Sequence, residues 1–222
     1  MVLSKSSLLI FAPLFMLYSC APARYVQPLH KGQTAISANL GGPLIGYSNT
    51  TIPVPLSSLA IGYGMNEDLT GFAGIHTTSL AFGVIQADIG ITKGILKPQS
   101  GMPGVSVTPV ANLMFDKWQH QFSFFPQLDA NAYWNYGKQK HCMYIGLSNW
   151  FDLHRNWAEG MQSNHWVPIV QAGNVFEHKR WAYTLELKYI APNYKNTPLV
   201  VDYRGIGGTG AVGVYIGVTK KF

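Results

Sequence analysis

The chain has 222 residues, of which 12% are charged and 47% are hydrophobic, and its 16 lysines and arginines outnumber its 10 aspartates and glutamates. An average soluble domain is about 25% charged, so this composition indicates either a poorly soluble globule or an outer surface that faces lipid. The cations are scattered rather than gathered in a basic stripe or helix, which argues against a nucleic-acid-binding protein.

Residues 1–19 have the layout of a secretory signal peptide. One cation, Lys5, precedes an uncharged apolar run from Leu8 to Tyr18. The run is too short to cross a bilayer as a helix, and it has the length of the apolar region of an export signal. We therefore predict that the mature protein leaves the cytoplasm.

Two cleavage sites compete at the end of this segment. Leu17-Tyr18-Ser19-Cys20 resembles a lipobox, after which the Cys20 thiol would carry a lipid such as palmitate, although Tyr18 stands where a small residue is usual. The rival is Ala21-Pro22-Ala23, a match for ordinary signal peptidase, which would cut before Arg24. We favour lipidation of Cys20, with residues 20–33 forming a lipidated tether. Cys142 would then be a lone small hydrophobic residue.

From Thr34 onward nearly every segment alternates between apolar and polar residues, and no helical stripe of any length occurs. Alternation with a period of two predicts β-strands, and the segments have about the 9–11 residues that a tilted membrane strand needs. We predict ten strands, at residues 34–41, 56–65, 69–78, 82–92, 104–115, 122–134, 141–151, 165–175, 181–191 and 209–221.

The predicted connections differ in length between the two ends of such a sheet. Three are short polar turns, at residues 66–68, 137–140 and 177–180, and three are long, at residues 42–55, 152–164 and 192–208. The short turns all fall at one end and the long loops at the other, which is typical of outer-membrane barrels. Residues 93–103 break this pattern, being a long connection at the short-turn end.

The alternation separates two faces on each strand. In residues 122–134, Phe124, Leu128 and Ala130 share one face, while Gln127, Asp129 and Asn131 share the other. A membrane barrel points its apolar face outward, the reverse of a soluble barrel. An aromatic girdle at the lipid–water interfaces would explain the large rings near predicted strand ends. These are Trp134, Tyr136, Trp150, Phe151, Trp166, Phe176, Trp181 and Tyr189.

The end of the chain carries a family resemblance. Val212, Val214, Ile216, Val218 and the terminal Phe222 alternate with smaller or polar residues. Residues 34–222 thus resemble the small β-barrels of the Gram-negative outer membrane, although Lys220 stands where an apolar or aromatic residue is usual. The resemblance implies an all-β, antiparallel up-and-down transmembrane barrel. It also implies contact with membrane lipid and recognition by the outer-membrane assembly machinery through the strand that ends at Phe222.

The inward faces of the predicted strands carry a polar cluster. Its members are Gln86, Asp88, Gln127, Asp129, Asn131, Glu186 and Lys188. Buried carboxylates need partners, and Lys188 is the predicted partner of these acids. A hydrogen-bonded plug is the favoured interpretation, and a narrow polar pore or small-ligand pocket is the alternative, because about ten strands enclose little free space.

No sequence motif of a known catalytic mechanism is present, and the histidines are dispersed. We therefore predict no catalysis, cofactor or metal, and a structural, adhesive or narrow-channel role in the outer membrane. One alternative is a hydrolase acting on lipid or peptide at the outer face. For it, Asp152 and His154 resemble the acid–histidine pair of omptin proteases, whose paired aspartates are absent here. The other alternative is a periplasmic, lipocalin-like lipoprotein that binds an apolar ligand.

Overall fold

The computed structural model describes residues 21–222 except 100, 154–155, 158–159, 162–164 and 197–200. The signal peptide predicted at residues 1–19 and the predicted lipid site at Cys20 lie outside the described residues. Within these residues, no helix is both long enough and apolar enough to cross a membrane.

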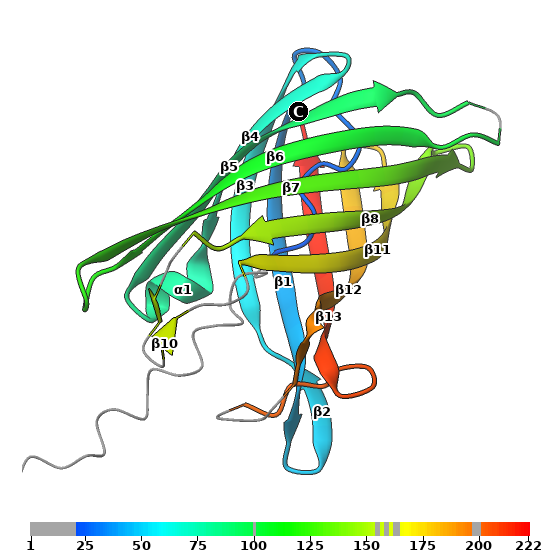
Figure 1. Cartoon of the computed structure of the whole chain (residues 1–222). Coiled ribbons are helices and arrows are strands. Elements are labelled where there is room, and N and C mark those ends of the chain that lie inside the picture. The colour runs from blue at the N-terminus through cyan, green and yellow to red at the C-terminus, as the bar shows by residue number, and fades with distance from the viewer. Residues whose placement is uncertain (1–20, 100, 154–155, 158–159, 162–164, 197–200) are drawn as a thin grey trace, which may run out of the picture.

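The described chain folds into a closed antiparallel β-barrel (Figure 1). Ten long strands form its wall, and each pairs with the next along the chain. They are β1 (Thr34–Tyr47), β3 (Leu56–Asn66), β4 (Leu69–His76), β5 (Val84–Leu96), β6 (Gly104–Asp116), β7 (Gln121–Tyr136), β8 (His141–Phe151), β11 (Trp166–His178), β12 (Trp181–Lys195) and β13 (Thr209–Lys221). Pairing of β13 with β1, from Ala35 opposite Lys221 to Pro43 opposite Gly213, closes the barrel.

The ten predicted strands are confirmed, with corrections at their ends. β1 continues to Tyr47 and forms a projecting hairpin with β2 (Thr50–Pro53), so residues 42–55 are not all loop. β5 continues to Leu96, which reduces the anomalous connection at 93–103 to residues 97–103. The remaining short elements are α1 (Thr77–Ala81) and the paired strands β9 (Asn156–Trp157) and β10 (Gly160–Met161).

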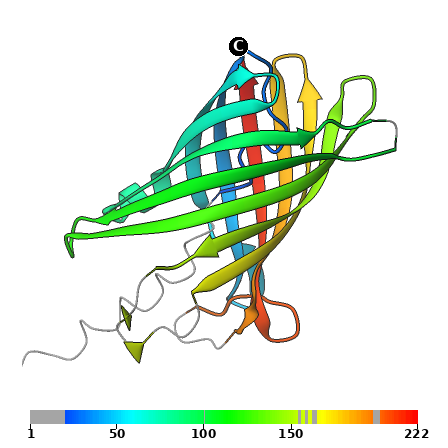
Figure 2. The same ribbon diagram turned by 45° about the horizontal axis from the view of Figure 1, so that its top comes forward.

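The barrel has two unlike ends. The turn end carries the connections at 67–68, 97–103, 137–140 and 179–180, together with the C-terminus. The loop end carries the β1–β2 hairpin, α1 and the connections at 117–120, 152–165 and 196–208. Figure 2 shows β1 and β13 side by side along the closing seam, with the C-terminus at the turn end.

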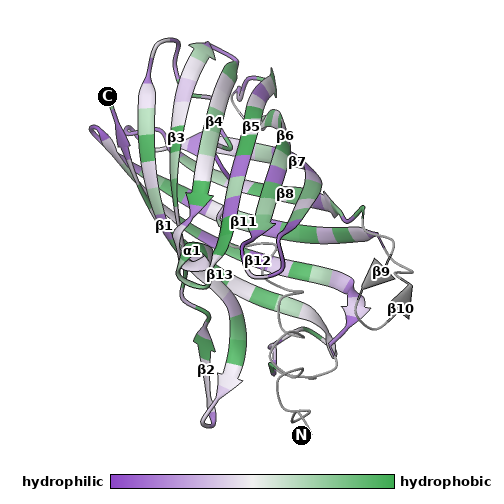
Figure 3. Ribbon diagram, turned by 90° about the vertical axis from the view of Figure 1, so that its left-hand side faces the viewer, coloured by the Kyte–Doolittle hydropathy of each residue, from purple (hydrophilic) through white to green (hydrophobic). Residues whose placement is uncertain are grey.

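The outer surface of the barrel is apolar and the interior is polar. Ile89, Leu128 and Leu185 point outward and are 53%, 44% and 46% exposed. Their neighbours on the same strands, Asp88, Asp129 and Glu186, point inward and are at most 4% exposed. Figure 3 shows the resulting alternation of hydrophobic and hydrophilic residues along the strands. A large side chain exposed on every wall strand is unfavourable in water and favourable in lipid.

Of the eight aromatic residues predicted for the girdle, five have the exposure near strand ends that a girdle requires, and one does not. Tyr136, Phe151, Trp166, Phe176 and Trp181 are exposed near strand ends. Trp134 and Tyr189 are half-buried. Trp150 instead points inward and is 6% exposed. It belongs to a buried apolar cluster at the loop end of the interior, with Val84, Met114, Phe125, Ile169, Ile190 and Ala191.

Candidate functional site: the polar lumen and the N-terminal segment

Residues 21–30, here called the luminal segment, run inside the barrel. A tether is predicted for this stretch, whereas in the structure it lies inside the lumen and bonds to the wall. At the turn end, Gly32 donates a backbone hydrogen bond to Gly64 at 2.8 Å. Deeper inside, Leu29 N–H donates to Thr70 Oγ1 at 2.7 Å, and Ser106 Oγ donates to the Val26 carbonyl at 2.6 Å.

The deepest contacts of the luminal segment lie near the middle of β12. The Ala23 N–H donates to both carboxylate oxygens of Glu186, at 3.2 and 3.1 Å. Lys188 Nζ donates to the Ala21 carbonyl at 2.8 Å and lies 3.5 Å from Glu186 Oε1. Tyr144 Oη donates to Glu186 Oε2 at 2.5 Å. The fully buried Glu186 carboxylate therefore has a cation and three hydrogen bonds.

A second buried ion pair joins the luminal segment to the opposite wall. Arg24 Nη2 lies 2.9 Å from Asp88 Oδ2, and His76 Nε2 lies 2.9 Å from the same oxygen. All three side chains are at most 7% exposed. The hydrogen-bond geometry fits a carboxylate that accepts from both neighbours, which is the strong, charge-assisted type of bond.

This pairing corrects the prediction that Lys188 partners the inward acids as a group. Lys188 lies beside Glu186, whereas Asp88 has Arg24 and His76 as partners. Neither Arg24 nor His76 is among the predicted lumen residues. Arg24 is 64 positions from Asp88 and belongs to no periodic segment, and His76 is the last residue of β4. The available signal was that a buried aspartate requires a nearby cation.

The other predicted lumen residues also face inward. Gln127 Nε2 donates to both oxygens of Asp129, at 2.8 and 3.0 Å, and to Ser148 Oγ at 3.1 Å. Gln171 Nε2 donates to Asn131 Oδ1 at 2.8 Å. At the loop end, Ser79 Oγ, carried by α1, donates to Gln86 Oε1 at 2.9 Å. These bonds pair polar groups that cannot reach bulk water, whereas Gln86 Nε2 and Gln171 Oε1 have no hydrogen-bond partner among the described residues.

Two glycines in the wall make room for the luminal segment. A Cβ atom at Gly62 of β3 would lie 2.6 Å from the Tyr25 ring, and one at Gly74 of β4 would lie 2.9 Å from Arg24 Nη2. A Cβ atom at either position would require the Tyr25 ring or the Arg24 guanidinium to shift. The wall is therefore shaped around the segment as well as bonded to it.

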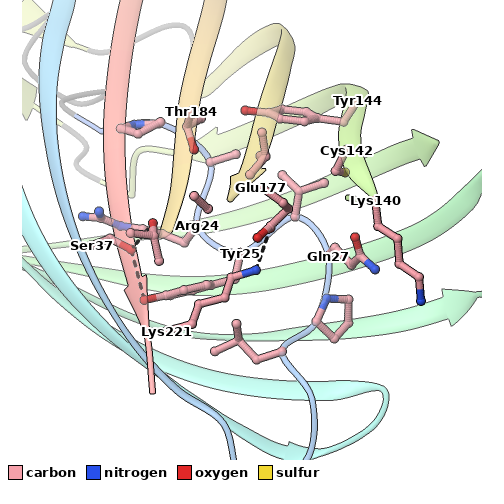
Figure 4. Close-up of a pocket in the computed structure, with 18 of the residues that line it drawn as sticks. Arg24, Tyr25, Gln27, Ser37, Lys140, Cys142, Tyr144, Glu177, Thr184 and Lys221 are labelled. Carbon is pink, nitrogen blue, oxygen red and sulfur yellow. Dashed lines mark hydrogen bonds and ion pairs between the residues drawn. The ribbon is translucent and has the colours of Figure 1, made fainter. Parts of the chain in front are cut away.

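The luminal segment leaves two cavities beside it. A cavity of about 340 Å³ opens at the turn end, where Tyr25 points toward Ser37 and Lys221 pairs with Glu177 at 2.6 Å (Figure 4). The buried thiol of Cys142 also lines it. A cavity of about 30 Å³, enough for roughly one water molecule, lies next to Arg24 and Asp88.

The residues proposed for hydrolysis are not brought together as a described site. His154 lies outside the described residues, and Asp152 is buried, with its N–H bonded to the His165 carbonyl at 2.8 Å. Among the residues that the structure describes, no group of three or more histidine, cysteine, aspartate and glutamate side chains is placed to hold a metal ion.

No protein-family model matches the chain, and no curated protein sequence matches it. Among solved structures, it is similar to the translocator domain of the autotransporter NalP from Neisseria meningitidis, with 10% identity and a TM-score of 0.49 over 89% of this chain and 91% of that one. It is also similar to an outer-membrane channel from Pseudomonas putida F1, with 11% identity and a TM-score of 0.49 over 90% of this chain and 99% of that one. Values this low carry no activity, ligand or partner over to this chain.

Proposed function

We propose that this protein is an integral β-barrel of the outer membrane with a structural, non-catalytic role and a lumen filled by its own N-terminal segment. The observation that carries the proposal is the inverted polarity of the barrel. The exposed outer side chains are aliphatic or aromatic, and the interior holds two carboxylates in ion pairs and a network of amides. A lipocalin-like barrel that binds an apolar ligand needs an apolar interior and a polar outer surface.

A structural role fits the state of the lumen better than an open channel does. The luminal segment and its partners occupy the interior from the turn end to the middle of the wall, and the apolar cluster around Trp150 fills the loop end. The inward carboxylates are engaged by this chain's own cations and donors, which supports a non-catalytic role. The shorter connections favour placing the turn end in the periplasm and the loop end outside.

The membrane proposal is tested by migration in gels and by fractionation. A folded membrane barrel keeps its compact form in detergent until it is boiled, so the unboiled protein is expected to migrate faster than the boiled protein and to sediment with outer membranes. Recovery of the protein in the soluble periplasmic fraction, with identical migration before and after boiling, would contradict the proposal.

We further propose that Cys20 is lipid-modified. Support comes from Ala21 and Ala23, whose main-chain bonds to Lys188 and Glu186 would be lost if the chain were cut before Arg24.

The modification is tested by Cys20→Ser. The substitution should abolish fatty-acid labelling and move cleavage to the bond between Ala23 and Arg24. An unchanged mature N-terminus in the variant, starting at Arg24 in both proteins, would show that ordinary signal peptidase processes the chain.

A further inference from the structure

We propose that the barrel lumen is a binding site for a short, arginine-bearing peptide, and that residues 21–29 are its resident occupant. This role goes beyond a structural one, because a separate peptide could occupy the lumen in place of residues 21–29. It depends on contacts of the described residues alone and not on lipidation of Cys20.

Four wall side chains hold the main chain of the segment. These are Thr70 of β4, Ser106 of β6, and Glu186 and Lys188 of β12; they are at most 5% exposed and bond to backbone groups of residues 21–29. Bonds to backbone groups recognise the path of a peptide's main chain largely irrespective of its side chains. The wall therefore supplies affinity for a peptide in this conformation.

The selective contact is the one at Arg24. Its guanidinium lies 2.9 Å from the Asp88 carboxylate, to which His76 Nε2 is also 2.9 Å away. Both members of the pair lie against Gly74, where a Cβ atom would be 2.6 Å from Asp88 Oδ1 and 2.9 Å from Arg24 Nη2. A neutral or acidic residue in this place would leave Asp88 buried beside His76 without the arginine that neutralises it. The site should therefore discriminate strongly against a peptide that lacks the cation.

The segment is separable from the barrel. Residues 21–33 belong to no strand, and their contacts with the wall are hydrogen bonds at single residues. Removing residues 21–29 would therefore leave every pairing between the ten wall strands intact. Both cavities are bordered by the segment. Arg24 Nη1 and Asp88 Oδ1 have no hydrogen-bond partner within the described structure, so the pair is open to exchange with water that enters the smaller cavity.

Limited trypsin digestion of the full-length protein in detergent tests the proposal. Lys31 is exposed at the turn end, whereas Arg24 is 8% exposed inside the lumen, so trypsin should cut after Lys31 and spare Arg24. All samples carry Cys20→Ser and are made without export and refolded in detergent, so that no lipid is attached and signal peptidase cannot remove residues 21–23. After gel filtration, mass spectrometry should find the peptide that ends at Lys31 still bound to the barrel.

Two aspartate variants provide the comparison. Asp88→Asn removes the buried partner of Arg24 and should reduce retention of the peptide at least tenfold. Asp202→Asn alters a matched pair, since Asp202 lies 3.2 Å from Arg204 with both side chains about half exposed, and it should retain the peptide as the parent does. Heat-dependent migration of each sample shows that the barrel itself is folded, which separates failure of this proposal from failure of the membrane proposal.

A labelled synthetic peptide with the sequence of residues 21–31 gives a second measurement. It should bind the full-length Arg24→Glu variant, whose own segment is repelled by Asp88, and the same peptide with glutamate in place of the arginine should not bind. Loss of the peptide from the nicked parent, equal retention in Asp88→Asn, or no binding of the synthetic peptide to Arg24→Glu would each overturn the proposal. If Lys31 resists trypsin, the synthetic peptide alone decides.

Discussion

The carboxylate of Glu186 shows how a single residue couples the barrel wall to its contents. It is fully buried, and it is shared by the Lys188 ammonium, the Tyr144 hydroxyl and the Ala23 amide. Removing one member of a buried ion pair is strongly destabilising, because the other charge stays in a poorly hydrated place. The luminal segment thus supplies one of the donors that stabilise the buried Glu186 carboxylate.

Lys188→Met should lower the free energy of unfolding by about 3–5 kcal/mol, because it leaves Glu186 without its cation. The measurement is urea unfolding in lipid vesicles. Lys195→Met, on the exposed end of the same strand, is the control and should change the midpoint little. Equal midpoints for the two variants would mean that water hydrates Glu186 freely.

Gly62→Ala should destabilise the protein by about 1–3 kcal/mol, the usual cost of overpacking, because its Cβ would lie 2.6 Å from the Tyr25 ring. In a protein that already carries Tyr25→Ala, and so lacks that ring, Gly62→Ala should be nearly neutral. Gly71→Ala is a milder control, since its Cβ meets only the flexible end of Met65. The coupling is measured as a double-mutant cycle, and additive effects would show that Tyr25 does not occupy this place.

The partners of Asp88 mark the limit of prediction at the scale of residues. Glu186 and Lys188 share an inward face because they are two positions apart on one strand, so their proximity follows from periodicity alone. Arg24 comes from a segment without regular structure, and its place depends on the whole barrel being closed around it. No local pattern encodes such a contact.

At the scale of elements, the period of two was sufficient to find the strands and to orient them. Where prediction failed, the same rule explains the failure. Trp150 was assigned to the outer girdle because it lies near a strand end, yet it has the same parity on β8 as the inward Cys142, Tyr144 and Ser148. The strands β1 and β12 also extend beyond their predicted ends. Gly and Pro residues interrupt the apolar pattern of β1 while its pairing continues with β2, and on β12 the pairing resumes at Lys195 after an irregularity that follows Ile190.

Arginine substitutions on β7 test the facing of the wall. Leu128→Arg places a charge on the outer surface near the middle of the strand and should cost about 2–4 kcal/mol in a bilayer. Asn131→Arg faces the lumen, so it should disturb the bond with Gln171 without blocking insertion into membranes. Insertion efficiency into vesicles is the measurement. Tolerance of Leu128→Arg together with a soluble product would contradict the membrane assignment.

At the scale of the whole molecule, the barrel closes between its first and last wall strands. Ser37 and Thr219 are bonded at 2.8 Å although they are 182 positions apart, so the seam can form only when the complete chain is present. Closure leaves no unpaired edge, which a membrane requires because lipid cannot satisfy backbone groups. The final residue lies at this seam, where the Phe222 N–H donates to the Thr34 carbonyl at 2.8 Å.

Substitution of Phe222 tests recognition by the assembly machinery separately from the stability of the folded barrel. It is 58% exposed, and its ring lies 5.0 Å from Lys220 Nζ, so it contributes little to packing. Phe222→Ala should therefore refold in detergent with an unchanged unfolding midpoint, because the backbone bond to Thr34 is retained. In cells, the same variant should reach the outer membrane several-fold less efficiently if the assembly machinery recognises the terminal aromatic ring. Normal assembly of the variant in cells would contradict recognition through Phe222, and failure to refold in detergent would show instead that the ring is needed for closure of the seam.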